Sequence, residues 1–407
     1  MRVVILNRDY PGFLRELYLS RPGLEDASYA EQLAVRNESL FGVADFYSRN
    51  FIAHGHQAME IHLNNPWLQH AWAREHGLVL EPPPPPKLPA VAGNGRSEVF
   101  RASLGRRLKT ALRPVFAPVA RPLLRRLRKT VPASATEELV MAAQIAEFRP
   151  DVILNQEMAA LRSEALRRVK SNGMLAIGQI ASALPENENF AVYDLVISSL
   201  PNQVDWFRRQ GVRSELNRLA FEPAILEKFG PQPERDIPLS FVGSLSPDHV
   251  SRIVFLEHLA TRTPLKVWGN GIERLPKSSP LHALYQGQAW GRDMYDVVRR
   301  SKITLNFHID LAEDWANNMR LYEATGMGAL LLTDWKKNLH EMFVPGKHVA
   351  TYTDNDDCVR QIHALLSDNE TREHIAAAGQ QHAIREQNYF RRAGEILDLA
   401  GKLRSGA

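Results

Sequence analysis

The sequence has little cysteine, no long apolar run at its start and none of several familiar catalytic motifs. Cys358 is the only cysteine among 407 residues, so an intrachain disulfide is impossible and nothing indicates an oxidising compartment. The first apolar run, Val3 to Leu6, is far too short for a signal peptide or a membrane-spanning helix. We therefore expect a cytoplasmic protein.

The motifs of several enzyme classes are also missing. The chain has no strand-linked G-x-G-x-x-G, no G-x-x-x-x-G-K-S/T, no H-E-x-x-H and no C-x-x-C. His54 and His56 are metal ligands by type, but they lack a nearby carboxylate or cysteine, so we place them in a turn. We expect no metal ion and no cofactor. Acidic residues are plentiful, and a hydrolase with paired carboxylates therefore stays open.

Positive charge is concentrated in one segment. The formal net charge is +4, yet ten Lys and Arg and no Asp or Glu lie between Arg101 and Thr130. The rest of the chain holds forty basic against forty-six acidic residues, so the charge gives little reason to expect specific nucleic-acid binding. Leucines lie among these arginines, after five prolines from Pro82 to Pro86. Residues 101–129 are predicted either to contact an anionic membrane or acceptor, or to be a solvated insertion.

Apolar runs alternate with helical patterns along most of the chain, which predicts the α/β class with parallel sheets. One long helical region is expected from Tyr29 to Asn50, with Leu40 and Ala44 at near-helical spacing, and another helix from Gln156 to Lys170. The predicted strands are residues 3–7, 58–62, 151–155, 174–180, 193–199, 239–242, 265–268, 302–307, 329–333 and 349–352.

A proline-rich crossing around Gly230 divides these strands into two series. We predict an N-terminal Rossmann-like domain over residues 1–222, with an insertion at about 81–134, and a C-terminal Rossmann-like domain over residues 223–385. A last helix within 386–407 is expected to pack back on the N-terminal domain.

The stretch from Asn318 to Thr333 carries the clearest functional signal. It predicts a helix that begins at Asn318, whose side chain caps free N–H groups, and ends at Gly326 before an apolar strand. Arg320 lies at the positive end of that helix, which favours an anion such as a diphosphate. Glu323, about one turn further, can accept hydrogen bonds from vicinal sugar hydroxyls. The simpler alternative is that Arg320 and Glu323 merely pair with each other on the surface.

The pattern Asn-x-Arg-x-(aromatic)-Glu-Ala-x-Gly-x-Gly before an apolar strand resembles the donor-site segment of group 1 glycosyltransferases, especially the branch similar to the sporulation protein CgeB. The resemblance extends from about Leu239 to Arg392. It implies the GT-B architecture, two Rossmann-like domains facing across a cleft. It also implies that Glu323 binds the nucleotide ribose and that the helix start faces the diphosphate. Many members have a second Glu eight positions earlier, where this chain has Trp315.

Other site candidates follow strands, where ligands gather in open α/β sheets. Asp9, after the first strand, is a candidate acid or base on the acceptor side, or else a turn-capping residue. Asn155, Gln156, Glu157 and Gln179 are further acceptor-side candidates. The catalytic candidates are Arg320, Glu323, Asp9 and His308. The donor-binding candidates are Gly243, Ser244, Asn270, Gly271, Asn306, His308, Asn318, Arg320 and Glu323.

These features predict a glycosyltransferase that moves a sugar from a nucleotide-sugar to a surface polysaccharide, a lipid-linked glycan or a protein. The reaction is expected to need no metal ion, because Arg320 and the helix start can neutralise the leaving diphosphate. Retention of anomeric configuration is an expectation from the resemblance. Two alternatives stay open: a nucleotide-sugar epimerase on the same fold, and a non-catalytic protein that binds through its basic segment.

Overall fold

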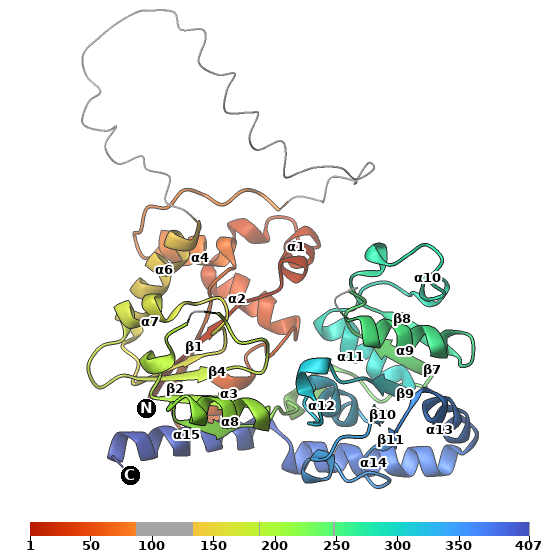
Figure 1. The fold of residues 1–407 in the computed structure, drawn as a ribbon. Coiled ribbons are helices and arrows are strands. Elements are labelled where there is room, and N and C mark those ends of the chain that lie inside the picture. Colours follow the sequence, from red (N-terminus) through yellow and green to blue (C-terminus); the bar gives the residue numbers. More distant parts are fainter. Residues whose placement is uncertain (87–132, 187, 247–248, 407) are drawn as a thin grey trace, which may run out of the picture.

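The computed structural model describes residues 1–86, 133–186, 188–246 and 249–406. Two parallel sheets, each flanked by helices, form two domains that lie side by side (Figure 1). The predicted α/β class is therefore confirmed. The basic segment at 101–129 lies outside the described residues.

The first domain is built on a six-stranded parallel sheet in the order β2-β1-β3-β4-β5-β6. Its central strands are short apolar runs buried on both faces, as is usual when helices cover both sides of a sheet. The strands are β1 (Arg2–Asn7), β2 (Gln57–His62), β3 (Val152–Asn155), β4 (Leu175–Gln179), β5 (Leu195–Ser198) and β6 (Ser214–Leu216). The helices are α1 (Pro11–Leu19), α2 (Tyr29–Glu38), α3 (Phe46–Ala53), α4 (Pro66–Glu75), α6 (Ala133–Phe148), α7 (Ser163–Val169) and α8 (Pro201–Arg209).

The second domain has a five-stranded parallel sheet in the order β11-β10-β9-β7-β8. Its strands are β7 (Ile237–Val242), β8 (Leu265–Trp268), β9 (Ser301–Asn306), β10 (Leu330–Asp334) and β11 (Ala350–Tyr352). The helices that follow β7 along the chain are α9 (Val250–Ala260), α10 (Leu281–Leu284), α11 (Gly291–Arg300), α12 (Met319–Gly326), α13 (Asn355–Ser367), α14 (Asn369–Glu386) and α15 (Tyr389–Ser405).

The long helical region predicted from Tyr29 to Asn50 is helical at both ends but not continuous. It is two helices, α2 and α3, separated by residues 39–45. Leu40, Gly42 and Ala44 in this connection have φ values of 59°, 61° and 39°, which a right-handed helix does not allow. Leu40 and Ala44 are buried there, so their apolar spacing reflects packing of a turn into the core.

The helix predicted from Gln156 to Lys170 is also too long, because only α7 forms. The Asn155 side chain accepts a hydrogen bond from the Glu157 backbone N–H at 2.9 Å, and the chain turns at once after β3. Such local side-chain bonds compete with helix formation. The loop that results keeps Gln156 and Glu157 at the end of the sheet.

Two segments tie the domains together. The crossing after β6 pairs with the end of α14: the Phe221 N–H donates to Gln387 O at 2.8 Å, and the Tyr389 N–H donates to Phe221 O at 3.0 Å. Helix α15 then packs against α3 and runs beneath the first domain (Figure 1). One hydrophobic cluster joins residues from both sheets, including Ile5 and Leu331. The domains thus share a core at their base.

Among the described residues, no helix is both long and apolar enough to span a membrane.

Candidate functional site in the cleft between the domains

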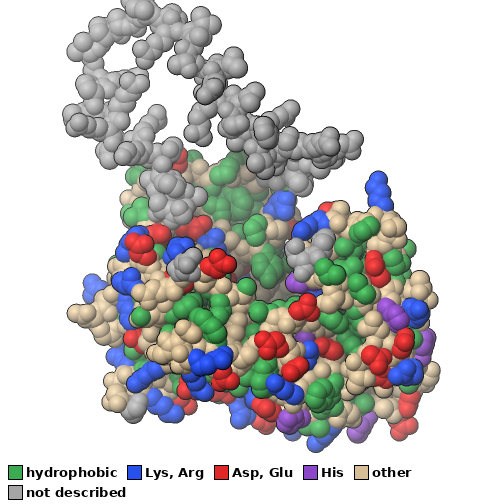
Figure 2. All heavy atoms as spheres, in the orientation of Figure 1, with side chains coloured by type: hydrophobic (Ala, Val, Ile, Leu, Met, Phe, Trp, Pro, Cys, Tyr) green, Lys and Arg blue, Asp and Glu red, His purple; other side chains and the backbone are tan. Residues whose placement is uncertain are grey.

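A cavity of about 480 Å³ lies between the two domains, above their shared core. The space-filling view shows the molecule hollowed between the domains (Figure 2). The cavity is lined by the ends of β1 and β3 from the first domain and by the ends of β7 and β9 and the start of α12 from the second. Its volume is within the roughly 300–1,000 Å³ common for small-molecule sites.

Most of the site residues predicted from the sequence meet in this cavity. It is lined by Asp9, Gly243, Ser244, Asn270, Asn306, Asn318, Arg320 and Glu323. Gly271 and His308 do not line it. Gly271 instead backs against the loop after β7, and the His308 side chain is buried with its Nδ1 2.5 Å from Asp334 Oδ1. Burial raises the pKa of Asp334, but the hydrogen bond and charge of His308 help to lower it below its ordinary value.

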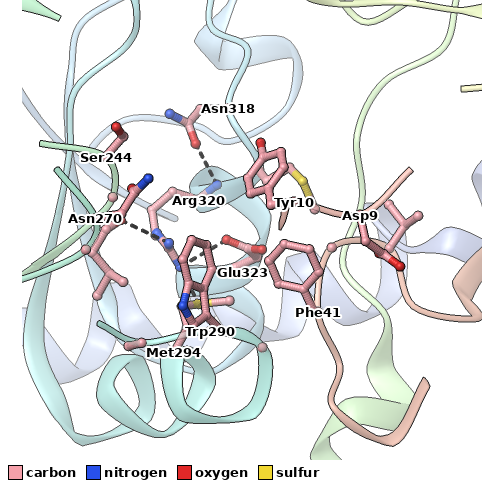
Figure 3. A pocket seen from close by; sticks show the side chains of 18 of the residues that line it. Asp9, Tyr10, Phe41, Ser244, Asn270, Trp290, Met294, Asn318, Arg320 and Glu323 are labelled. Atoms are coloured by element: carbon pink, nitrogen blue, oxygen red, sulfur yellow. Dashed lines mark hydrogen bonds and ion pairs between the residues drawn. The ribbon is translucent and has the colours of Figure 1, made fainter. Parts of the chain in front are cut away.

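Helix α12 presents its N-terminus to the cavity. Asn318 is the N-cap, and its side-chain oxygen accepts from the Arg320 N–H at 2.8 Å. Gly326 is the last helical residue, and a Cβ there would lie 2.3 Å from the Phe221 ring, so the helix packs tightly on the domain crossing. Asn318, Arg320 and Glu323 therefore project from a fixed helix (Figure 3).

Arg320 and Glu323 form a buried ion pair at the cavity wall. Arg320 Nη1 lies 3.0 Å from Glu323 Oε2, and the side chains are 12% and 9% exposed. The Arg320 guanidinium also donates to Val242 O at 3.1 Å and contacts Met294 Sδ at 2.6 Å. Burial raises the pKa of Glu323, and the Arg320 charge opposes that shift. The pair is thus not the exposed surface pair that the simpler alternative supposed.

Two loops close one end of the cavity with very little space between their backbones. The Gly243 N–H donates to Trp268 O at 3.0 Å, and the Leu245 N–H donates to Asn270 O at 2.8 Å. Gly269 has a φ of 149°, and a Cβ there would lie 1.7 Å from Gly243 O. Only glycine permits this approach. It brings Ser244 and Asn270 to the same rim (Figure 3).

Asp9 faces the cavity from the first domain but is already paired. Its Oδ1 lies 2.5 Å from Arg36 Nη2, its Oδ2 lies 3.4 Å from His62 Nδ1, and its side chain is 0% exposed. Burial raises the pKa of Asp9, but the charges of Arg36 and His62 outweigh burial and hold the pKa well below its usual range. A paired carboxylate of low pKa is a weak base. This geometry favours a structural role for Asp9.

Several cavity residues were not identified from the sequence. Arg252, in the first turn of α9, donates from Nη1 to Ser244 O at 3.3 Å and is buried beside Ser244. The sequence signal that could have identified Arg252 is its position soon after Gly243, the glycine that follows β7. Tyr10, Phe41 and Trp290 form an aromatic group across the domain boundary, with ring centroids 5.5 to 6.3 Å apart (Figure 3). No sequence pattern signals that contact, because it joins segments far apart in the chain.

Within the described residues, no group of three or more His, Cys, Asp or Glu side chains is arranged to hold a metal ion.

One family model matches part of the chain. Residues 252–398 match the family model described as glycosyl transferase-like. The match begins at Arg252 and includes all of α12. No curated protein sequence matches the chain significantly.

Solved structures match nearly the whole chain. A glycosyltransferase from Rickettsia africae has a TM-score of 0.56 at 10% identity, covering 100% of this chain and 99% of that one. Sucrose-phosphate synthase from Thermosynechococcus elongatus has a TM-score of 0.54 at 12% identity, covering 100% of both chains. HepE from Anabaena, solved with UDP-glucose, has a TM-score of 0.53 at 12% identity, covering 99% of this chain and all of that one.

Identities this low show a shared fold. The chain has the GT-B fold, two Rossmann-like domains across a cleft, and the fold prediction is confirmed. The family match and this fold together support a glycosyltransferase. The CgeB-like branch stays a prediction.

Proposed function

We propose that the protein is a glycosyltransferase that uses a nucleotide-sugar, and that this donor binds in the cleft cavity. The observation that carries the proposal is the buried Arg320–Glu323 pair at the N-terminus of α12, inside a cavity between the two domains. A diphosphate favours helix N-termini and guanidinium groups, and ribose hydroxyls favour a carboxylate acceptor. The cavity offers all three.

The diphosphate would bind between two arginines. The Nε atoms of Arg320 and Arg252 are buried and have no hydrogen-bond partner among the described residues. Both side chains line the cavity close to Ser244 and Gly243. Unpartnered buried donors favour an anionic ligand that completes their hydrogen bonds. When the bond to the sugar breaks, the same groups would stabilise the charge that develops on the leaving diphosphate.

The remaining donor contacts follow from this placement. Glu323 would accept hydrogen bonds from the ribose hydroxyls, and Ser244, Asn270 and Asn306 would contact the rest of the donor. The Anabaena relative in complex with UDP-glucose makes UDP-hexoses the first donors to try. We propose a surface polysaccharide, a lipid-linked glycan or a protein as the acceptor, bound on the first domain.

A panel of nucleotide-sugars tests this proposal. Free nucleoside diphosphate and the sugar product are measured with each donor, with and without a mixture of glycan acceptors. Acceptor-dependent release of diphosphate is the expected result. Formation of an epimer of the donor would instead establish a nucleotide-sugar epimerase. If no donor is turned over or bound, the proposal is contradicted, and the remaining alternative is a non-catalytic protein that binds through its basic segment.

We also propose that transfer needs no divalent cation and retains the anomeric configuration. Arg320, Arg252 and the start of α12 offer positive charge that a metal ion would otherwise supply at the diphosphate. Activity should persist in excess chelator, and the anomeric proton coupling of the product should match that of the donor. Activity that is lost in chelator and restored by one particular metal would overturn the first part.

The basic segment suggests peripheral binding to an anionic surface. Ten Lys and Arg lie at 101–129, and each cation near an anionic membrane contributes roughly 1 kcal/mol. The full chain should sediment with vesicles that contain phosphatidylserine, and less so as salt is raised. Unchanged sedimentation after charge reversal at Arg106, Arg107, Arg125 and Arg126 would exclude this membrane contact.

A further inference from the structure

A second cavity of about 250 Å³ opens beside the cleft in the first domain. It shares Val43, Gln156 and Glu157 with the cleft cavity, so these residues form the junction between the two spaces. It is also lined by Ser199, the residue after β5, and by Tyr389, the first residue of α15. We call this second space the side chamber. Its volume is below the roughly 300–1,000 Å³ common for small-molecule sites, a size that suits one ring rather than a chain.

Two residues that line the side chamber carry hydroxyl groups with no hydrogen-bond partner among the described residues. Ser199 is 6% exposed and Tyr389 1% exposed, yet neither Ser199 Oγ nor Tyr389 Oη contacts a donor or acceptor among the described residues. A buried hydroxyl without a partner is unusual, because leaving it unsatisfied destabilises a protein. These groups therefore point to a ligand that would complete their hydrogen bonds.

Neighbouring polar groups in the same wall bond to one another and not to these two hydroxyls. Gln156 Nε2 donates to Gln179 Oε1 at 2.8 Å, and Gln179 Nε2 donates to Tyr47 Oη at 2.9 Å. The Tyr47 ring lies edge-on to the Tyr389 ring at 5.1 Å. These contacts hold Gln156, Gln179, Tyr47 and the Tyr389 ring in place along the wall.

Glu157 stands at the junction with an unused carboxylate. Its side chain forms no hydrogen bond or ion pair with the residues that the structure describes, although its backbone N–H is bonded to Asn155. Burial raises its pKa to about 7, while Arg8 lowers it and Asp9 raises it. A carboxyl group there can accept a hydrogen bond from a hydroxyl, and when ionised it repels phosphate.

We propose that the side chamber binds a neutral sugar ring of the acceptor, with Ser199 and Tyr389 contacting its hydroxyls and Glu157 contacting the hydroxyl nearest the donor. The inference rests on the proposed function and narrows the acceptor to one that ends in a neutral sugar. Phosphorylated and carboxylated sugars are disfavoured by Glu157. The binding itself needs no donor.

Binding of simple sugars to the full chain tests the proposal. The probes are the methyl glycosides of glucose, galactose, mannose and N-acetylglucosamine, with glucose 6-phosphate as the anionic comparison. Saturation-transfer NMR without nucleotide should detect at least one methyl glycoside and not glucose 6-phosphate. Ser199→Ala and Tyr389→Phe should each weaken that binding roughly two- to tenfold. Glu157→Gln, which keeps an acceptor oxygen but loses the charge, should admit glucose 6-phosphate.

The controls separate this inference from the proposed function. Ser199→Ala and Tyr389→Phe remove only unpartnered hydroxyls, so both should fold with an unchanged or higher Tm. Ser367→Ala, on an exposed face of α13, should bind sugar as the wild type does. UDP affinity, measured by calorimetry, should be unchanged in all three. Two results would contradict the proposal that the side chamber binds a sugar. One is binding of UDP without binding of any methyl glycoside. The other is sugar binding by Ser199→Ala and Tyr389→Phe that equals that of the wild type. Sugar binding that depends on the chamber, without binding of any nucleotide, would support the chamber while contradicting the proposed function.

Discussion

At the scale of residues, the cavity is distinguished by the buried charges that line it. The Arg320–Glu323 and Arg36–Asp9 pairs lie on opposite sides of it. Burying a charge costs free energy, and an ion pair compensates only in part. Removing one partner would leave the other uncompensated. Substitutions that keep the size and shape of the side chain are therefore the most informative tests of these residues.

Arg320→Lys should weaken binding of the preferred nucleoside diphosphate roughly ten- to a hundredfold. The guanidinium contacts Glu323, Val242 O and Met294 Sδ together, and one ammonium cannot reproduce that fork and also reach phosphate oxygens. Loss of a hydrogen bond to a charged group costs about 1.5–3 kcal/mol. Calorimetric titration measures the change.

Arg360→Lys is the matched control. Arg360 pairs with Asp357 at the same three-residue spacing on a helix, but its side chain is 67% exposed. It should bind nucleoside diphosphate as the wild type does. If Arg320→Lys and Arg360→Lys bind nucleoside diphosphate with equal affinity, Arg320 stabilises the fold and does not bind the diphosphate.

Glu60 should make stability depend on pH. Its buried carboxylate accepts from Asn7 Nδ2 at 3.2 Å and Ser48 N–H at 3.3 Å, and burial raises its pKa to about 7, although Arg36 opposes this. Between its ordinary value of 4.5 and about 7, the folded state keeps a proton that the unfolded state has lost. Stability from this group is therefore present below pH 4.5 and falls as pH rises towards 7.

Gln does not titrate, so the stability of Glu60→Gln should fall less than that of the wild type as pH rises from 5 to 7.5. The urea midpoint is compared at pH 5 and pH 7.5 for the wild type, Glu60→Gln and the exposed control Glu370→Gln. A fall of the same size in Glu60→Gln and the wild type would show that Glu60 titrates normally in the fold.

Three of the site residues that were predicted from the sequence and line the cavity lie close together in the chain. They are Asn318, Arg320 and Glu323, and their helix is fixed by a local cap, so their common direction was predictable. His308 was predicted from its place after β9, but its side chain turns to Asp334. Glu157 was predicted as an acceptor-side candidate from its place after a strand, and it lines both cavities. Trp290 was not predicted, because its aromatic contacts are with Tyr10 and Phe41, which are distant in the chain.

At the scale of elements, most strands were predictable and helix ends were not. The central strands of both sheets are buried apolar runs, and their composition reports burial directly. The edge strand β6 was not predicted, because its sequence Ser-Glu-Leu is short and two of its three residues are exposed. The failed helices contain residues whose spacing is helical but whose backbone is not, such as Leu40 at a φ of 59°. Packing of a turn into the core decided the segment around Leu40, and the local Asn155 hydrogen bond decided the start of the helix predicted at 156–170. Periodicity alone records neither effect.

At the scale of the whole molecule, the cavity exists only while the domains keep their arrangement. Gly291, the first residue of α11, helps to fix it: its φ is 47°, and a Cβ there would lie 2.0 Å from Ser39 O in the first domain. The next residue, Arg292, donates its N–H to the same oxygen at 2.7 Å. The two domains therefore meet backbone to backbone beside the aromatic group.

Gly291→Ala should destabilise the protein by about 1–3 kcal/mol through strain and this clash. Thermal unfolding measures the loss, and the affinity for nucleoside diphosphate should fall with it because the cavity wall moves. Gly401→Ala is the control, since Gly401 is exposed in α15 and nothing lies within 4 Å of its added Cβ. That substitution should be neutral or stabilising. A Tm for Gly291→Ala equal to that of Gly401→Ala would show that the two domains do not depend on this contact.

The central claim is that Glu323 and the start of α12 bind the nucleotide of the donor. Calorimetric titration of the wild type, Glu323→Gln and the exposed control Glu370→Gln with UDP, GDP, ADP and dTDP tests it most directly. Glu323→Gln keeps one acceptor oxygen but places an NH₂ where an acceptor is required. We predict that one nucleotide binds the wild type and Glu370→Gln alike, and binds Glu323→Gln roughly ten- to a hundredfold more weakly. Equal affinity in all three proteins, or no binding to any, would contradict the claim.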